Sequence, residues 1–139
     1  MSRSFAILAA ASLSIATPAL AQDDDGARTA PPAAPYVKVS DALPLPEFIP
    51  GLGTLFVDPA TLPAGPFLAY DHDGTLSATI YMTPLAALES GTAYDGLGTG
   101  SATVSSVDIY YNAGHPGVEV PHAHVVLYLD EDARERLAE

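Results

Sequence analysis

Short apolar runs alternate with turn residues along most of this chain. From Tyr36 onward, Gly, Pro, Asn or Asp interrupts the apolar pattern about every eight to twelve residues, a spacing typical of short strands joined by turns. The runs expected to be strands are 36–43, 54–57, 67–70, 75–82, 104–111 and 118–129. Because strands outnumber helical segments, the pattern predicts a mainly β (α+β) fold, a small antiparallel sheet or barrel-like domain with one or two short helices.

The clearest of these strands lies between residues 75 and 82. Its apolar side chains occur at every second position: Leu76, Ala78, Ile80 and Met82. This alternation indicates a strand that is buried on one face only. The preceding residues, 71–74, end in an Asp-Gly pair, which favours a hairpin turn when alternating segments flank it. We therefore expect 67–70 and 75–82 to pair as antiparallel strands.

Two segments have the composition of short helices. In residues 83–91, Thr83 is placed to cap the first turn, Pro84 occupies the first helical position, and Gly91 marks the stop. The tail 130–139 begins with acidic residues, which suit the positive end of a helix dipole.

Residues 1–21 have the layout of a cleavable bacterial Sec-type signal peptide. Arg3 provides a positive start, 5–16 is an apolar run, and 19–21 (Ala-Leu-Ala) supplies the small residues that signal peptidase accepts before Gln22. The apolar run is too short for a membrane-spanning helix, which needs about 20 residues. The sequence therefore predicts a periplasmic or secreted protein that has no membrane attachment after cleavage.

A polar segment, residues 22–35, separates the predicted signal peptide from the predicted domain. It is rich in Asp, Ala and Pro and lacks aromatic and β-branched apolar residues. Such a segment has little apolar surface to bury, so we expect a flexible linker. The remaining residues, 36–139, are enough for a single β-rich domain.

Composition restricts the partners and the chemistry of this domain. The 139 residues carry a formal net charge of −12, with 17 acidic and 5 Lys or Arg side chains. So few cations cannot assemble a groove for nucleic acid, and an acidic surface is repelled by anionic lipid. The chain has no cysteine, which excludes disulfides, thiol catalysis, thiolate metal sites and a lipidated cysteine anchor. Homo-oligomerisation remains open.

A short motif at the predicted hairpin resembles the first motif of haloacid-dehalogenase-type phosphatases. Residues 71–76 read D-H-D-G-T-L after an apolar strand, and the resemblance implies Asp71 as nucleophile, Asp73 as general acid and a bridging Mg²⁺. However, the next segment alternates with period two where that fold needs a crossover helix, and no Lys follows Lys38 to neutralise a phosphoryl group. An Asp-rich hairpin turn is the preferred interpretation, and the phosphatase is a distant alternative.

Three of the four histidines, His115, His122 and His124, lie close together in the sequence. On a strand, the spacing of His122 and His124 puts both imidazoles on one face, about 6–7 Å apart. His115 lies in the preceding loop and could fold back as a third ligand. Zinc and other transition metals favour imidazole, so these three residues are the candidate metal ligands, with Glu119 and Asp108 as further donors.

The same stretch carries a partial resemblance to a known metal-binding family. The run from Gly117 to His124 resembles the first motif of the cupins, small β-barrels that hold a metal with an H-x-H pair. The acidic residue expected after the second histidine is missing from 125–129, and no second cupin motif follows.

A broader resemblance covers residues 46–128. Its landmarks, in order, are Pro50-Gly51-Leu52-Gly53, Gly65-Pro66, Tyr70, Gly74, Leu76, Tyr81-Met82, Val107-Asp108-Ile109, Tyr111, Gly114-His115-Pro116-Gly117, Pro121-His122 and Tyr128. Together they resemble an uncharacterised family of exported bacterial domains of unknown function, whose pattern has G-M-G-x-H early and G-H-P…P-H-x-x-x-H-F-Y late. Leu55 and Val126 stand where that pattern carries histidine, so only His115 and His122 keep family positions. The resemblance supports fold and export and implies no activity.

These observations predict an exported, acidic, β-rich domain with a non-enzymatic binding or structural role. No catalytic set can be selected, because no serine lies in a nucleophile elbow. The alternative is a transition-metal-binding protein or simple metalloenzyme that uses His115, His122 and His124, with zinc as the first metal to test.

Overall fold

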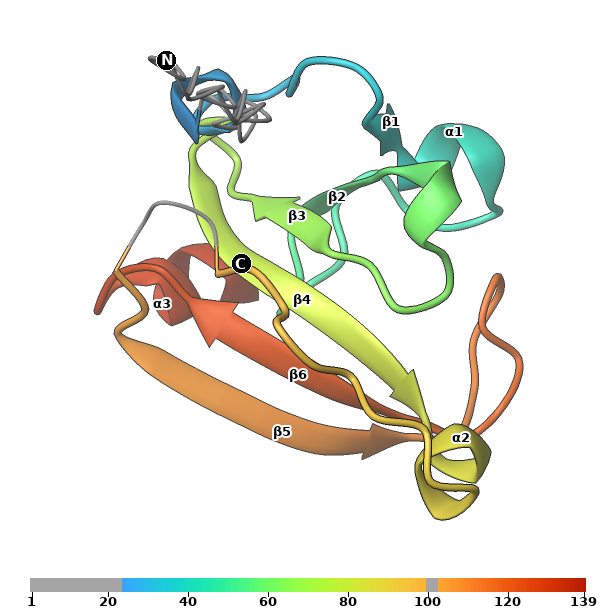
Figure 1. Ribbon diagram of the computed structural model, residues 1–139. Coiled ribbons are helices and arrows are strands. Elements are labelled where there is room, and N and C mark those ends of the chain that lie inside the picture. Colours follow the sequence, from blue (N-terminus) through green and yellow to red (C-terminus); the bar gives the residue numbers. More distant parts are fainter. Residues whose placement is uncertain (1–23, 100–102) are drawn as a thin grey trace, which may run out of the picture.

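The computed structural model describes residues 24–99 and 103–139, which form a six-stranded antiparallel sheet with three short α-helices (Figure 1). The strands are β1 (Val37–Lys38), β2 (Thr54–Val57), β3 (Phe67–Tyr70), β4 (Leu76–Pro84), β5 (Ser106–Asn112) and β6 (His122–Tyr128). Their order in the sheet is β1-β2-β3-β4-β6-β5, and every neighbouring pair is antiparallel. The predicted mainly β, α+β class is confirmed, in the form of an open sheet.

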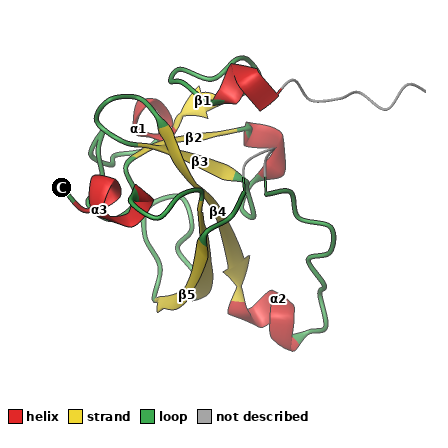
Figure 2. Ribbon diagram, turned by 90° about the vertical axis from the view of Figure 1, so that its left-hand side faces the viewer, coloured by secondary structure: helices red, strands yellow, loops and turns green. Residues whose placement is uncertain are grey.

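The three α-helices are α1 (Val39–Ala42), α2 (Leu85–Glu89) and α3 (Ala133–Ala138), and two 3-10 helices are formed by Asp24–Ala27 and Pro59–Thr61. Helices α2 and α3 lie at opposite ends of the sheet, and the side view shows that β2 and β3 cross the direction of β4 and β5 (Figure 2). That crossing is the accumulated twist expected of an open sheet. None of the helices in the described parts of the chain is both long and apolar enough to span a membrane.

Strand β4 is the central element, and both of its faces are buried. Ala78, Ile80 and Met82 lie on one face, while Ser77, Thr79 and Tyr81 are also buried on the other. The expectation of burial on one face only is therefore wrong. Part of the reason is a covering loop: the Tyr81 hydroxyl donates to the carbonyl of Gly98 at 2.5 Å, so residues after α2 return across the second face.

The main core covers the sheet face that carries Ile80. Side chains of β2, β3, β4 and β6 meet Ala133 and Leu137 of α3 there, and burying each large apolar side chain contributes roughly 1.5–3 kcal/mol. Gly53 allows the chain to enter β2 under α3. It has φ +77°, and a Cβ atom at this position would lie 2.4 Å from the Tyr70 carbonyl oxygen.

A smaller core on the opposite face involves the N-terminal described residues. Phe56, Leu68 and Tyr70 pack there with Ala27, Ala30, Tyr36 and Leu76. A register shift between Ala69 and Tyr70 brings Leu76 to this side, instead of the side of Ala78 on which alternation placed it. The Tyr70 hydroxyl donates to the carbonyl of Ala27, at 2.6 Å. Part of the segment expected as a linker thus contacts the β3–β4 hairpin.

Three predicted elements differ from the observed ones. The strand expected over 118–129 is β6, which begins only at His122. In residues 36–43, only Val37–Lys38 pair with β2, and Val39–Ala42 form the helical turn α1. In residues 83–91, β4 continues through Pro84, so the helix begins at Leu85 and Thr83 is a strand residue. The reason is pairing with β6, whose His122 lies opposite Pro84.

Candidate metal centre

The H-x-H pair lies on β6, between β4 and the edge strand β5. Alternation along β6 places His122 and His124 on the face of the main core, with exposed fractions of 0% and 1%. His124 lies opposite Met82 on one side and Tyr110 on the other. Two imidazoles are therefore held side by side on a paired strand whose position is set by both neighbours.

His115 reaches the pair through a tight turn. Its backbone N–H and carbonyl exchange hydrogen bonds with those of Val118, both at 3.0 Å, and Gly114 and Gly117 adopt positive φ angles of 128° and 89°. A Cβ atom on Gly114 would lie 2.9 Å from the carbonyl carbon of Glu119, so glycine is needed where the chain doubles back. The predicted return of His115 toward the strand pair is what the structure shows.

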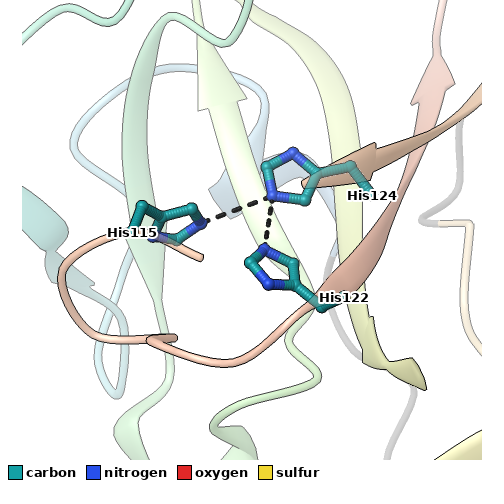
Figure 3. A group of neighbouring side chains, drawn as sticks. All are labelled: His115, His122 and His124. Carbon is teal, nitrogen blue, oxygen red and sulfur yellow. Dashed lines mark hydrogen bonds between the residues drawn. The ribbon is translucent and has the colours of Figure 1, made fainter. Parts of the chain in front are cut away.

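The three histidines present one nitrogen each to a common point. Nε2 of His124 lies 2.9 Å from Nε2 of His122 and 3.4 Å from Nε2 of His115 (Figure 3). One ligand atom from each of the three histidines lies within 4.8 Å of the others. Ligand nitrogens on a tetrahedral zinc ion are separated by about 3.3 Å, given Zn–N distances of about 2.0–2.1 Å. The two separations that involve His124 are thus close to those of a three-histidine zinc site.

The opposite ring nitrogens are all engaged by oxygen atoms. Nδ1 of His122 donates to the carbonyl of Val120 at 2.7 Å, and Nδ1 of His115 donates to the carbonyl of Pro116 at 3.0 Å. Because a carbonyl only accepts, these two rings carry their proton on Nδ1 and turn an Nε2 lone pair toward the common point. Such oxygen contacts behind the ligand atom orient and polarise metal-binding imidazoles.

His124 completes the arrangement through Tyr110. Nδ1 of His124 lies 3.0 Å from the hydroxyl of Tyr110, which can either donate to it or accept from it. Without a metal, Nε2–H of His124 can donate to only one of its two neighbours. A metal bound at Nε2 would require the proton of His124 on Nδ1, where the Tyr110 oxygen could accept it. Burial, followed by the charges of His122 and His115, lowers the pKa of His124 to about 4, so the ring is neutral near pH 7.

The two carboxylates considered as further donors are not part of this group. Asp108 pairs with Arg134 through two hydrogen bonds and accepts a third from the hydroxyl of Tyr128. Glu119 is exposed on the loop before β6. Among the described residues, the cluster of candidate ligands consists of the three histidines alone.

The D-H-D-G-T-L motif forms a hairpin turn, as the alternation predicts. Strand β3 is antiparallel to both of its neighbours, and Asp71 follows it in the turn to β4. Its Oδ1 accepts from the N–H groups of Asp73 and Thr75 at 3.0 and 2.9 Å, and Oδ2 accepts from Nε of Arg136 at 2.8 Å. This carboxylate is buried and fully engaged in structural hydrogen bonds, as expected for a turn and not for a nucleophile.

Two features of the site were missed by sequence reasoning. Tyr110 was part of a predicted strand, and the pairing that puts it beside His124 needs the register of β5 against β6. The second is an apolar cavity next to His115 and His124, which depends on how the segment 39–52 crosses the sheet. Alternation within 104–111 could have placed Tyr110 on one face, but not opposite a histidine.

The fold and the site together define a small α+β domain with one antiparallel sheet and a cluster of two buried histidines and one partly buried histidine. The chain is 44% identical to the hypothetical protein TTHB210 from Thermus thermophilus, whose crystal structure superposes with a TM-score of 0.59. The similarity covers 73% of this chain and 97% of that one, so the chain belongs to the same family as TTHB210. No protein-family profile matches the chain, and no curated protein matches it. The resemblance to exported bacterial domains stays a prediction.

Proposed function

We propose that this protein binds one transition-metal dication, with zinc as the first candidate, through Nε2 of His115, His122 and His124. The observation that supports this most strongly is that the three Nε2 atoms face one another while each Nδ1 is held by an oxygen. Without a metal, the single Nε2–H of His124 can be donated to only one of the two Nε2 lone pairs of His115 and His122. A cation at the common point would bind all three Nε2 atoms at once.

The donor set favours a soft-to-borderline metal over a hard one. Neutral imidazole suits zinc, copper, nickel and iron, whereas magnesium and calcium prefer carboxylate and carbonyl oxygens, which the cluster lacks. Three protein ligands also leave one position of a tetrahedral ion for water or another molecule. We assign a binding role and no reaction, in line with the non-enzymatic expectation from the sequence.

The predicted signal peptide, residues 1–21, lies outside the described residues. If export occurs as predicted, the metal is bound beyond the cytoplasmic membrane, and the absence of cysteine means that no thiolate competes with histidine for it.

The direct test is metal analysis and zinc titration of the purified full chain beside its His115→Gln variant. His115 is only partly buried, so this variant removes a ligand with less risk to folding than a change at His122. We expect one zinc per chain, a loss of affinity of at least tenfold in the variant, and a rise in Tm of about 10 °C at a hundredfold excess of zinc over Kd. The matched control is His72→Gln, since His72 is the histidine outside the cluster.

The proposal fails if the wild-type chain takes up no stoichiometric transition metal and its Tm is unchanged by zinc. It also fails if His72→Gln weakens zinc binding as much as His115→Gln does. Circular dichroism of each variant without metal shows that the variants are folded, so that lost binding is not lost structure.

A further inference from the structure

A cavity of about 450 Å³ lies beside the histidine cluster, between the main-core face of the sheet and the segment 39–52. This volume is within the range of small-molecule sites, roughly 300–1,000 Å³. Aliphatic side chains form most of its wall, including Leu43, Leu45, Ile49 and Leu52. The cavity is therefore large enough for a small organic molecule and is mostly apolar.

The polar side chains of the wall are grouped together. Tyr110, Asn112, His115 and His124 are the lining residues with polar side chains, and the structure brings them side by side. Tyr110 is paired opposite His124, Asn112 lies opposite His122, and Nε2 of His115 faces Nε2 of His124. The cavity thus has one polar end, and that end is the candidate metal centre.

The lining of the cavity contains no Asp, Glu, Lys or Arg, so with neutral histidines it carries no formal charge. A dication held by three neutral imidazoles would then be the single charge in an apolar wall. Such an uncompensated charge is costly to bury and attracts an anion. A three-histidine site also leaves a coordination position for that anion.

From these observations we infer that the cavity binds a small aliphatic monocarboxylate, whose carboxylate oxygen occupies the open position of the metal and whose chain lies among the leucines. The inference rests on the proposed function, because the metal supplies the positive charge to which the carboxylate binds. An aliphatic chain matches the rest of the wall, which offers almost no hydrogen-bonding side chains away from the histidines.

The entrance of the cavity has exposed apolar side chains. Leu62 and Val37 line the cavity and are 51% and 42% exposed, so they lie where the cavity meets solvent. On the other side, Gly117 lies against Leu43: a Cβ atom at Gly117 would come within 2.5 Å of Cδ1 of Leu43. The turn that carries His115 therefore also forms part of the cavity wall.

The test is titration of octanoate and acetate into the Zn²⁺-loaded full chain, followed by the same titration of the Co²⁺-loaded chain with visible absorption. Each buried CH₂ is worth about a fourfold gain in affinity, so we expect octanoate to bind at least on the order of 10²-fold more tightly than acetate. Octanoate should also change the cobalt absorption spectrum, because its carboxylate replaces a water ligand.

The key variant is Leu62→Glu, which places a negative charge at the entrance. We expect at least a tenfold loss in octanoate affinity with unchanged zinc affinity. The matched control is Leu88→Glu, the same change on α2 at a residue that is 44% exposed and does not line the cavity. This control should bind octanoate as the wild type does.

Five outcomes overturn the inference, and they can be told apart. If zinc binds but octanoate binds no better than acetate, or Leu62→Glu equals Leu88→Glu, the cavity inference fails and the proposed function stands. If octanoate binds equally with and without metal, the carboxylate does not meet the metal. If Leu62→Glu changes the oligomeric state in light scattering and leaves octanoate binding unaltered, a second copy covers the cavity. If no metal binds at all, both proposals fail.

Discussion

Two regions of this sheet gather polar residues, and they differ in what those residues leave available. In the β3–β4 turn, Asp71 accepts two backbone N–H groups, and its other oxygen accepts from Arg136 and from the Ser77 hydroxyl. At the far end of β4, the three histidines use their Nδ1 atoms for structure and turn their Nε2 atoms toward one another. In the first region both carboxylate oxygens of Asp71 are hydrogen-bonded within the fold, whereas in the second the three Nε2 atoms face one another and can act as ligands.

A sequence motif is therefore a weaker indicator of a functional site than the hydrogen-bonding state of the side chains that form it. The D-H-D-G-T-L run matches a catalytic motif over six residues, yet its buried carboxylate serves the turn. The H-x-H pair is a common pattern in sequences, yet the structure adds a third imidazole and an oxygen behind each ring. Four experiments test this contrast, and they follow in order of expected effect.

The largest effect should come from Asp71→Ala. Removing this carboxylate leaves the N–H groups of Asp73 and Thr75 without an acceptor, and the partly buried guanidinium of Arg136 keeps only its hydrogen bonds to Asp130 and Ser77. We therefore expect the free energy of unfolding to fall by about 3 kcal/mol. Zinc affinity should stay within about twofold, since distant sites act independently. Urea unfolding and zinc titration measure the two quantities.

The control for that experiment is Asp73→Ala, two residues away in the same motif. Asp73 is exposed, and its backbone N–H is the group that bonds to Asp71. A change within about 0.5 kcal/mol is expected. Equal losses for Asp71→Ala and Asp73→Ala would contradict the view that the carboxylate of Asp71 alone organises the turn.

Next in size is Tyr110→Phe, which removes the oxygen behind His124. Loss of such a contact behind a metal ligand lowers metal affinity by about 10–100-fold, and we expect roughly tenfold, or about 1.4 kcal/mol. Zinc titration provides the measurement. Tyr111→Phe is the matched control, because Tyr111 is exposed and lies on the opposite face of β5. If both variants bind zinc like the wild type, Tyr110 does not support His124.

A smaller effect should appear when pH is lowered. Burial alone raises the pKa of Asp71, but the hydrogen bonds from Thr75, Arg136 and Ser77 outweigh it and hold this pKa below its usual value. A carboxylate with a depressed pKa in the folded state stabilises the protein above its unfolded pKa of about 4. That contribution is lost as pH falls through the folded pKa.

The measurement is the free energy of unfolding between about pH 6 and pH 3, for the wild type and for Asp71→Asn. The wild type should lose stability more steeply below about pH 4, because the variant has no carboxylate to protonate at this position. Parallel curves would show that Arg136 and the turn do not favour the ionised form of Asp71.

The smallest effect should come from His72→Ala. This side chain stacks on Phe48, with ring centroids 3.7 Å apart, and contacts the terminal carbonyl of Glu139, but it is exposed. We expect a loss of about 0.5 kcal/mol in urea unfolding and no change in zinc binding. A large change in zinc affinity would mean that the metal contacts are not confined to the three-histidine cluster.

Local patterns in the sequence predicted the mainly β class and most strand positions. The runs 54–57 and 67–70 coincide with β2 and β3, and the Asp-Gly pair does lie in the hairpin turn. These features depend on alternation and turn chemistry, which act over a few residues. The i, i+2 spacing likewise determined that His122 and His124 share a face.

Long-range pairing decided the rest, because it depends on residues that are distant in the chain. Pairing with β6 extends β4 through Pro84 and displaces the expected start of the helix. Burial of the second face of β4 requires the segment around Gly98, which lies far from Tyr81 in the chain. The oxygen behind His124 comes from Tyr110 on another strand, and the cavity exists only because 39–52 crosses the sheet. Local sequence patterns identified the residues that could bind a metal, whereas the pairing of distant segments brought their ligand atoms together beside an apolar cavity.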